Sequence, residues 1–407
     1  MKIKRFAFVL GCFLIFLSVK GLYAGNFKFT TRQRYVTIPV ETSNYLMLVE
    51  VRINDSYPLN FIIDTGVKTT LITEPLLASI LDLKSTESII LLGLGQEGFI
   101  QAPLVRGVKL NLPGLEGEGF NLAILPETNV NFSEIFGKPV HGIIGYDLLK
   151  DFPVLINYRD KYIRFYNRAD YPKPRKSVTL PLPIRESKPY IKIVMESVNG
   201  DTIHTEVLLD MGASHPLYLN ERFKNLVPVI TDTYLGRGIS GELFGVAGRL
   251  SSLSFGPFVL KSPIASFPNA SLYGTNDNFS RWPGLLGGAV LSRFIFVLDY
   301  NNQLIHIRKT YKINAPFFFN PSGLEVIATG ISNSQFVIHY VRPGSPADLA
   351  GLLPGDQILS VNQIFQKNLS LDNILSEINA PNGSMIRMTV SREFKTHTYR
   401  FKLREDI

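Results

Sequence analysis

The sequence contains an internal repeat, and this feature constrains the fold more than any other. Residues 61–66, with the sequence FIIDTG, return as residues 207–212, with the sequence VLLDMG. Self-similarity of this kind indicates that one structural unit occurs twice. Five pairs of segments follow in the same order at a nearly constant offset: 37–39 with 179–181, 61–66 with 207–212, 93–98 with 236–241, 141–145 with 283–287, and 152–165 with 294–307. The repeat therefore predicts two related lobes, joined by the basic, proline-containing segment 171–176.

Each lobe is expected to be built from β-strands. Short apolar runs rich in Val, Ile, Phe and Tyr, such as residues 45–53 and 191–198, are separated by turns rich in Gly, Pro and Asn. Few segments have a helical period, and the exceptions, residues 76–83 and 371–378, are short. We therefore predict a mainly β protein with an N-terminal lobe at 25–176, a second lobe at 177–312 and a separate module at 316–407.

The N-terminus has the three parts of a cleavable signal peptide. Residues 1–5 are basic, residues 6–19 are almost wholly apolar, and Ala24 is a small residue before Gly25. The apolar run is shorter than the roughly 20 residues of a membrane-spanning helix. We therefore expect residues 1–24 to be removed and the mature chain to be exported, either to a periplasm or into the medium. Two alternatives stay open: a retained N-terminal membrane anchor, and lipidation at Cys12, where the apolar stretch nevertheless continues.

The composition excludes several classes of function. Cys12 is the only cysteine, so the mature chain has no thiol for disulfides, nucleophilic catalysis or zinc binding. The signal segment carries four of the 42 basic residues, which leaves 38 against 34 acidic residues, a net charge of +4. This charge is too small to favour nucleic-acid binding. The six histidines are scattered without metal-ligand spacing. We therefore expect no metal, no cofactor and no nucleic-acid partner.

Each copy of the repeat places an aspartate at the end of an apolar strand, followed by a glycine. A buried carboxylate costs several kcal/mol unless it is paired, hydrogen-bonded or protonated. If the lobes meet about a two-fold axis, Asp64 and Asp210 converge, and two carboxylates about 3 Å apart share one proton. The ionised member can then take a proton from a water molecule while the protonated member polarises a carbonyl group. A single Asp-Gly often only caps a turn, but the duplicated motif favours the catalytic interpretation.

The glycines of segments 93–98 and 236–241 have the spacing of a dinucleotide-binding fingerprint. That fingerprint needs a strand before it and a helix after it. Here residues 99–108 and 243–255 have the pattern of further strands. We therefore interpret the glycines as the tips of β-hairpins rather than as a nucleotide site.

These motifs resemble the two halves of an aspartic protease of the retropepsin-like or pepsin-like type. Residues 64–66 with 143–145 match one half and residues 210–214 with 285–287 match the other, within about residues 35–308. The resemblance implies a bilobal β-barrel fold, a catalytic dyad of Asp64 and Asp210, and a hairpin that closes over the substrate as a flap. By position, the residues that support the catalytic loops would be Thr65, Gly66, Gly212 and Ser214, and those of the flap would be Gly95, Gly98, Gly238 and Gly241.

The sequence departs from the family pattern at three positions. Met211 stands where the second motif should carry a hydroxyl residue, so one side of the hydroxyl bonding between the lobes is lost. Val67 and Lys68 replace the usual small residue and serine after the first motif, and Lys68, if close, would lower the pKa of Asp64. A weak or inactive site that binds peptides without cutting them is therefore the alternative function. His215 could line the cleft, although a structural role is the commoner fate of a lone histidine.

The C-terminal module resembles a bacterial-type PDZ domain. The resemblance is carried by residues 342–347, 350–352, 354–356 and 358–362, whose turns depend on three glycines. It implies a module that adds an extended peptide or a free C-terminus to the edge of its sheet. The peptide-binding residues would be Gly323, Leu324, Glu325 and Val326, with a groove helix near residues 371–378. Glu325 would oppose a bound carboxylate if it pointed inward, and the alternative is a structural appendage.

Together these features predict an exported aspartic endopeptidase. Its partner would be a polypeptide substrate, recruited or gated by the C-terminal module. Contact with a membrane is expected only if the N-terminal segment is retained.

Overall fold

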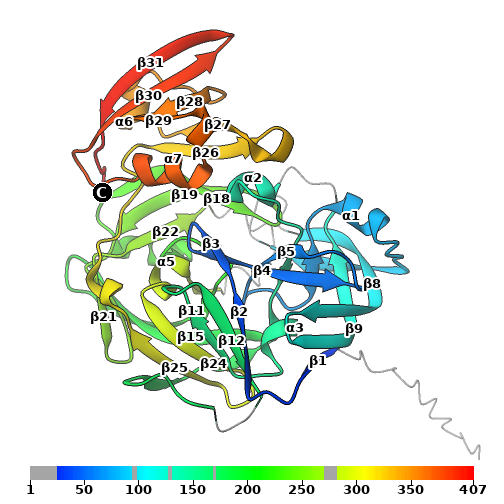
Figure 1. The fold of residues 1–407 in the computed structure, drawn as a ribbon. Coiled ribbons are helices and arrows are strands. Elements are labelled where there is room, and N and C mark those ends of the chain that lie inside the picture. Colours follow the sequence, from blue (N-terminus) through cyan, green and yellow to red (C-terminus); the bar gives the residue numbers. More distant parts are fainter. Residues whose placement is uncertain (1–24, 94–98, 127–130, 168–170, 270–281) are drawn as a thin grey trace, which may run out of the picture.

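The computed structural model describes residues 25–93, 99–126, 131–167, 171–269 and 282–407. The expected signal segment 1–24 and the glycines Gly95 and Gly98 lie outside these ranges. Within the described ranges, no helix has the length and apolar character needed to cross a membrane. The chain forms two β-rich lobes with a smaller C-terminal module above them (Figure 1).

The first lobe is a nine-stranded sheet with three short helices. The long strand β8 pairs with β7, β9 and β4, so strand pairing turns back on itself around the lobe. The strands are β1 (Asn26–Phe29), β3 (Glu41–Ser43), β4 (Leu46–Ile53), β5 (Leu59–Ile63), β6 (Thr70–Ile72), β7 (Glu87–Leu92), β8 (Phe99–Leu112), β9 (Leu115–Ile124) and β10 (Gly142–Ile144). The helices are α1 (Pro75–Ile80), α2 (Phe132–Phe136) and α3 (Tyr146–Leu149).

The second lobe is a ten-stranded sheet that repeats the central part of the first. Its strands are β14 (Ile184–Arg185), β15 (Lys188–Glu196), β16 (Thr202–Leu209), β17 (Leu217–Leu219), β18 (Ile230–Gly238), β19 (Gly241–Arg249), β20 (Ser252–Phe255), β21 (Phe258–Lys261), β22 (Ile264–Pro268) and β23 (Gly284–Leu286). The helical segments are η1 (Glu221–Leu226) and α5 (Gly288–Leu291). The main path of this sheet runs from β18 to β21 without returning, so the described strands do not form the closed barrel that the resemblance implied for each lobe.

A six-stranded antiparallel sheet joins the two lobes. Its strands are β2 (Tyr35–Pro39), β11 (Val154–Asn157), β12 (Tyr162–Tyr166), β13 (Val178–Pro181), β24 (Phe294–Asp299) and β25 (Leu304–Lys309), in the order β13-β25-β24-β11-β12-β2. At its centre Leu155 of β11 lies opposite Val297 of β24. These two residues occupy the same position in the two copies of the repeat, so the two-fold relation between the lobes passes between them.

The strands form where the sequence supplies the required alternation. In β15 every second residue, from Pro189 to Met195, is buried and the residues between them are more exposed, which is the pattern of a half-buried strand. By contrast, β11 and β24 are buried along their whole length, as expected for the centre of a sheet covered on both faces. The predicted mainly β class is therefore confirmed.

The C-terminal module has a sheet and an apolar core of its own. Its strands are β26 (Leu324–Thr329), β27 (Gln335–Val341), β28 (Gln357–Val361), β29 (Ile364–Phe365), β30 (Met385–Arg392) and β31 (Lys395–Lys402). Its helices are α6 (Pro346–Ala350) and α7 (Leu371–Ile378), with the single turns η4 (Ile331–Asn333) and η5 (Gln366–Asn368). Helix α7 begins at Ser370, whose side chain accepts a hydrogen bond from the N–H of Asn373.

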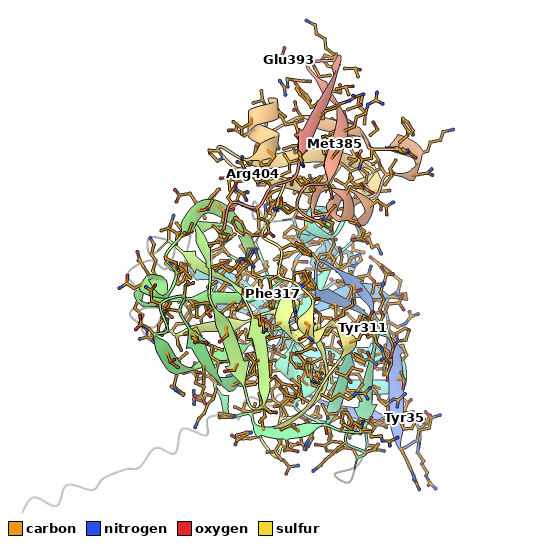
Figure 2. All side chains as sticks on the ribbon, turned by 90° about the vertical axis from the view of Figure 1, so that its left-hand side faces the viewer. Tyr35, Tyr311, Phe317, Met385, Glu393 and Arg404 are labelled. Carbon is orange, nitrogen blue, oxygen red and sulfur yellow. The ribbon has the colours of Figure 1, made fainter. Side chains whose placement is uncertain are left out.

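The segment that leads into the module is anchored on the second lobe. It contains the turn η3 (Tyr311–Asn314) and then Phe317, whose ring lies 3.5 Å below the guanidinium carbon of Arg293. Arg249 donates to the carbonyl of Phe317 at 3.1 Å and forms an ion pair with Glu405 at the other end of the module. Figure 2 shows Phe317 at the body of the molecule and Glu393 at the far tip of the module.

Candidate active site

The two aspartate loops are built in the same way in the two lobes. Asp64 follows β5 and Asp210 follows β16. Strand β10 runs parallel to β5, and β23 runs parallel to β16. The N–H of Asp64 donates to the carbonyl of Ile144 at 3.0 Å, and the N–H of Asp210 donates to Leu286 at 2.9 Å. The apolar-apolar-Gly segments thus hold the two aspartates by their backbones.

The glycine that ends each of these segments is required by close packing. A Cβ atom at Gly145 would lie 2.0 Å from the carbonyl oxygen of Asp64, and one at Gly287 would lie 2.1 Å from that of His215. Real Cβ atoms do not approach backbone oxygens so closely. The sequence shows these glycines only as a recurring pattern, and the close backbone packing explains why no larger residue fits there.

The carboxyl groups of Asp64 and Asp210 meet between the lobes and hydrogen-bond each other. Each is also held by the glycine of its own motif: the N–H of Gly66 donates to Asp64 Oδ1 at 2.6 Å, and that of Gly212 donates to Asp210 Oδ1 at 2.8 Å. A Cβ at Gly212 would lie 2.2 Å from the Cγ of Asp64. The second motif therefore needs glycine because the carboxyl group of the other lobe occupies that space.

The environment keeps one proton on the pair. Burial raises the pKa of Asp210 well above its ordinary value, and the negative charge of Asp64 raises it further. Burial also raises the pKa of Asp64, against the Gly66 hydrogen bond and the bond with Asp210, both of which lower it. The stronger elevation favours Asp210 as the member of the pair that carries the proton. Asp64 also retains more solvent access than Asp210, which is 9% exposed.

The cation that acts on the pair is Lys188, at the start of β15, whose charge lowers the pKa of both carboxyl groups. Sequence reasoning considered Lys68 for this role, but the side chain of Lys68 is exposed and is not among the charges that shift Asp64. Lys188 lies on β15, the strand that pairs with β16 before Asp210, but a single lysine in a strand carries no sequence signal of this role.

The hydroxyl of Thr65 joins the two lobes. It donates to the carbonyl of Leu209 at 2.5 Å and accepts from the N–H of Met211 at 2.9 Å. The side chain of Met211 is fully buried in the main apolar core and returns no such bond. The bonding between the lobes is therefore one-sided, as the sequence indicated.

The other predicted loop residues also lie at the cleft. Ser214 lines it, and its carbonyl accepts a hydrogen bond from Ala289 at 3.2 Å. His215 lines the cleft and also has a structural contact, because its Nδ1 lies 3.0 Å from the hydroxyl of Ser266. Burial lowers the pKa of His215 to about 4, so its ring is neutral at neutral pH.

A cavity of about 850 Å³ opens from the carboxyl pair. Its roof includes the β18–β19 hairpin, where Gly238 pairs with Gly241. The tip of this hairpin touches the end of β7: Ser240 Oγ donates to the carbonyl of Gly93 at 3.1 Å, and the Ile239 side chain lies where a Cβ of Gly93 would be. Of the four predicted flap residues, Gly238 therefore lines the cavity and Gly241 pairs with it at the hairpin tip.

The C-terminal module also reaches this cavity. Of the four predicted peptide-binding residues, Glu325 and Val326 line the cavity, together with Ile327 and His339. Leu324 belongs to the core of the module, and Gly323 packs against Ser345 with φ = 78°. Burial raises the pKa of Glu325 to about 7. No sequence pattern predicts that this strand meets the cleft, since the contact depends on how the module docks. Within the described ranges, no group of three or more His, Cys, Asp or Glu side chains could hold a metal ion.

Two parts of the chain match known protein families. Residues 49–148 match the family model described as aspartyl protease, and residues 337–392 match that of a PDZ domain. The first match contains Asp64 and Gly145 but ends before Asp210, so the second half rests on the repeat and the structure. No curated protein matches the chain. Among solved structures, an aspartic proteinase from Irpex lacteus aligns with 12% identity over 69% of this chain and 99% of its own, with a TM-score of 0.45. Residues 49–148 are thus similar to an aspartyl protease and residues 337–392 to a PDZ domain, and the C-terminal module that contains the second match is called the PDZ domain below.

Proposed function

We propose that this chain is an aspartic endopeptidase that hydrolyses peptide bonds with a water molecule activated by Asp64 and Asp210. The observation that carries the proposal is the pair of carboxyl groups that meet between the lobes, whose burial raises the pKa of both members and so favours a shared proton. Such a pair can act as base and acid in the same step.

The position of the proton gives the two carboxyl groups different roles in hydrolysis. Asp64 takes a proton from the water as its oxygen bonds to the peptide carbonyl carbon, while Asp210 donates a hydrogen bond to the carbonyl oxygen. The resulting tetrahedral species collapses when the C–N bond breaks and the leaving nitrogen receives a proton from the pair. No covalent intermediate with the protein forms. The N–H groups of Gly66 and Gly212 hold the two carboxyl groups in place throughout.

The cavity supports a polypeptide substrate. Its volume and its mainly apolar lining with a few polar groups are typical of a ligand-binding site, and its lining by both lobes leaves room for a chain that runs between them. The lining includes apolar side chains from both lobes, such as Leu46, Ile62, Tyr218 and Leu285. These flank the carboxyl pair and provide subsites on both sides of a scissile bond.

A second function, peptide binding without cleavage, is favoured by Met211. Methionine has no hydroxyl group, so the second lobe makes no counterpart of the hydrogen bonds that Thr65 makes between the lobes. Against this alternative, the backbone N–H of Met211 keeps its bond to Thr65, so the spacing of the pair does not depend on the missing hydroxyl. We also propose that residues 1–24 direct export, so that the substrate is met outside the cytoplasm.

The test uses the purified chain and a library of unstructured peptides in water enriched in ¹⁸O. Cleavage should place ¹⁸O in each new carboxyl terminus, and Asp64→Asn and Asp210→Asn should each abolish it. Asp201→Asn, at an exposed aspartate in the turn before β16, is the matched control and should cut like the parent. Cleavage that survives either dyad substitution would contradict the proposal, and binding without cleavage by the parent chain would favour the alternative.

A further inference from the structure

The catalytic cavity does not end within the two lobes. The same cavity that contains the carboxyl pair is lined by Glu325, Val326 and Ile327, consecutive residues of β26 in the PDZ domain. Its apolar lining also includes Ile135 and Phe136 of α2 and Ile239 at the hairpin tip. A wall of the cleft therefore belongs to a domain that is separate in sequence and has its own core.

Strand β26 is suited to this position because it lies at an edge of its sheet. It pairs with β27 on one side, and among the described strands none pairs with its other side. Alternate residues Leu324, Val326 and Ala328 are buried, whereas Glu325 and Ile327 are partly exposed. The exposed members of the strand are thus directed away from the domain's own core.

Polar contacts fix the PDZ domain to the hairpin that roofs the cleft. Arg237 of β18, whose side chain is 7% exposed, forms ion pairs with Glu134 of α2 at 3.1 Å and with Glu242 of β19 at 3.4 Å. His339 of β27 contacts the same Glu242 at 2.7 Å. One arginine therefore connects the first lobe and the second lobe at the point where the domain docks.

An aromatic cluster reinforces this docking. The ring of Tyr340 lies 5.7 Å from that of Tyr234 and 6.0 Å from that of Phe244. The ring of His339 lies 5.5 Å from Tyr234. Close aromatic pairs of this kind add to the energy of burial, so β26 is held at a defined place relative to Asp64 and Asp210.

The C-terminal part of β26, at Ala328, is covered by the first lobe. Helix α2 packs against β26, and a Cβ at Gly137 after this helix would lie 2.9 Å from Leu371 of α7 and 3.7 Å from Ala328. Ser43 adds a hydrogen bond to Asp372 at 2.8 Å. The space between β26 and α7 is therefore occupied here by the protein's own residues, whereas residues 325–327 remain open to the catalytic cavity.

We infer that the PDZ domain completes the substrate cleft, with Ile327 as a specificity-determining residue that favours an aliphatic or aromatic substrate side chain at one position away from the scissile bond. The inference rests on the proposed function and deepens it. The domain acts as a wall of the protease cleft, and the polypeptide that reaches β26 is the one that lies across Asp64 and Asp210. The apolar residues Ile135, Phe136 and Ile239 line the same cavity.

The test is the cleavage profile of the full-length chain on a peptide library. The parent should show a preference for apolar residues at one position remote from the cut. Ile327→Ala should weaken that preference about tenfold, the loss expected for roughly 1.4 kcal/mol of contact. Ile327→Glu should replace it with a preference for Lys or Arg, a gain that a merely structural role would not produce. Phe394→Glu, at the fully exposed tip of the same domain, is the control and should leave the profile unchanged.

A second measurement does not need cleavage. In an Asp210→Asn chain that also carries Cys12→Ser, Ile327→Cys introduces the only thiol. A benzophenone attached to this thiol should capture library peptides enriched in apolar residues, and one attached through Phe394→Cys should not. If the parent cuts but the Ile327 variants keep its profile, the inference is overturned and the proposed function stands. If the parent cuts nothing, the proposed catalysis is refuted and capture at position 327 decides the inference. Selective capture of apolar peptides would support a peptide-binding cleft completed by the PDZ domain, and unselective or absent capture would overturn it.

Discussion

The two lobes hold their aspartates with the same backbone contacts but with different side chains. In both, a parallel strand accepts the aspartate N–H, a glycine donates to the carboxyl group, and a second glycine lets the loops pack. The first lobe adds Thr65, whose hydroxyl makes both bonds to the other lobe, whereas the second has the buried, apolar Met211. Backbone symmetry thus creates the carboxyl pair, and side-chain asymmetry makes its two members unequal.

The largest effect should come from Gly212→Ala. The new methyl group would lie 2.2 Å from the Cγ of Asp64 and must displace that carboxyl group. Since a displacement of about 1 Å at a reacting group can cost about 100-fold in rate, we expect kcat/KM to fall at least that far. In Gly66→Ala the nearest atom, Asp64 Oδ1, is 3.0 Å away, so a loss of about tenfold is expected. Equal losses in steady-state assays would show that the two glycines have equivalent roles.

The next comparison is between Thr65→Val and Met211→Thr. The first change leaves the carbonyl of Leu209 and the N–H of Met211 buried without their partner, so the free energy of unfolding should fall by about 2–4 kcal/mol. The second removes a packed side chain, and we expect a loss of about 1–3 kcal/mol. Its kcat/KM should stay within about threefold of the parent, since Thr65 already makes both bonds.

Urea titration measures both stabilities, with the exposed Thr202→Val as control. A rise of more than about tenfold in kcat/KM for Met211→Thr would show that the missing hydroxyl limits catalysis.

The pH dependence should also separate the two aspartates. The pKa values of Asp64 and Asp210 are both raised by burial, so protonation favours the folded state. This stabilisation is complete below the ordinary pKa of 3.8 and is lost as pH rises through the folded values. Asp210→Asn removes the larger elevation, so its free energy of unfolding should exceed that of the parent by a margin that grows with pH, and more than for Asp64→Asn.

Activity should rise with pH as Asp64 ionises and fall as Asp210 loses its proton at higher pH. Denaturant titrations and kcat/KM measured from about pH 3 to pH 8 test this pH dependence. If the gain in unfolding free energy over the parent grows more with pH for Asp64→Asn than for Asp210→Asn, Asp64 is the member of the pair that holds the proton.

The smallest effect concerns the contact between the two hairpins. Ser240→Ala removes one hydrogen bond to Gly93, so we expect KM to rise about two- to threefold with little change in kcat. Gly93→Ala should have the larger effect of the two, because its methyl group would meet Ile239 at 2.2 Å. If both variants keep the parent KM, the contact contributes nothing to substrate binding.

Much of this architecture could be predicted because the repeat carries it. The pairing of Leu155 with Val297 follows from two copies meeting antiparallel, and the meeting of Asp64 with Asp210 follows from the same relation. Strand alternation and glycine positions are local signals, so they can be recognised in a single sequence.

What could not be predicted depends on docking between distant segments. Lys188 acts on the dyad only because β15 passes the cleft, and Ile327 lines the cavity only because His339 and Tyr340 fix the PDZ domain to the β18–β19 hairpin. Such contacts leave no periodicity or spacing in the sequence. The resemblance named the residues of the PDZ edge strand, but the covering of its C-terminal part by α2 is visible only in three dimensions.

The one-sided bond of Thr65 has a consequence for how such a site can change. In an assembly of two identical subunits, replacing the threonine would remove the hydroxyl from both sides, and no threonine hydrogen bond would be left across the axis. In one continuous polypeptide each half mutates alone, and the single hydroxyl of Thr65 bonds one acceptor, the carbonyl of Leu209, and one donor, the N–H of Met211. Met211 is therefore a substitution that covalent linkage of the halves permits and that a homodimer of the same design would not tolerate.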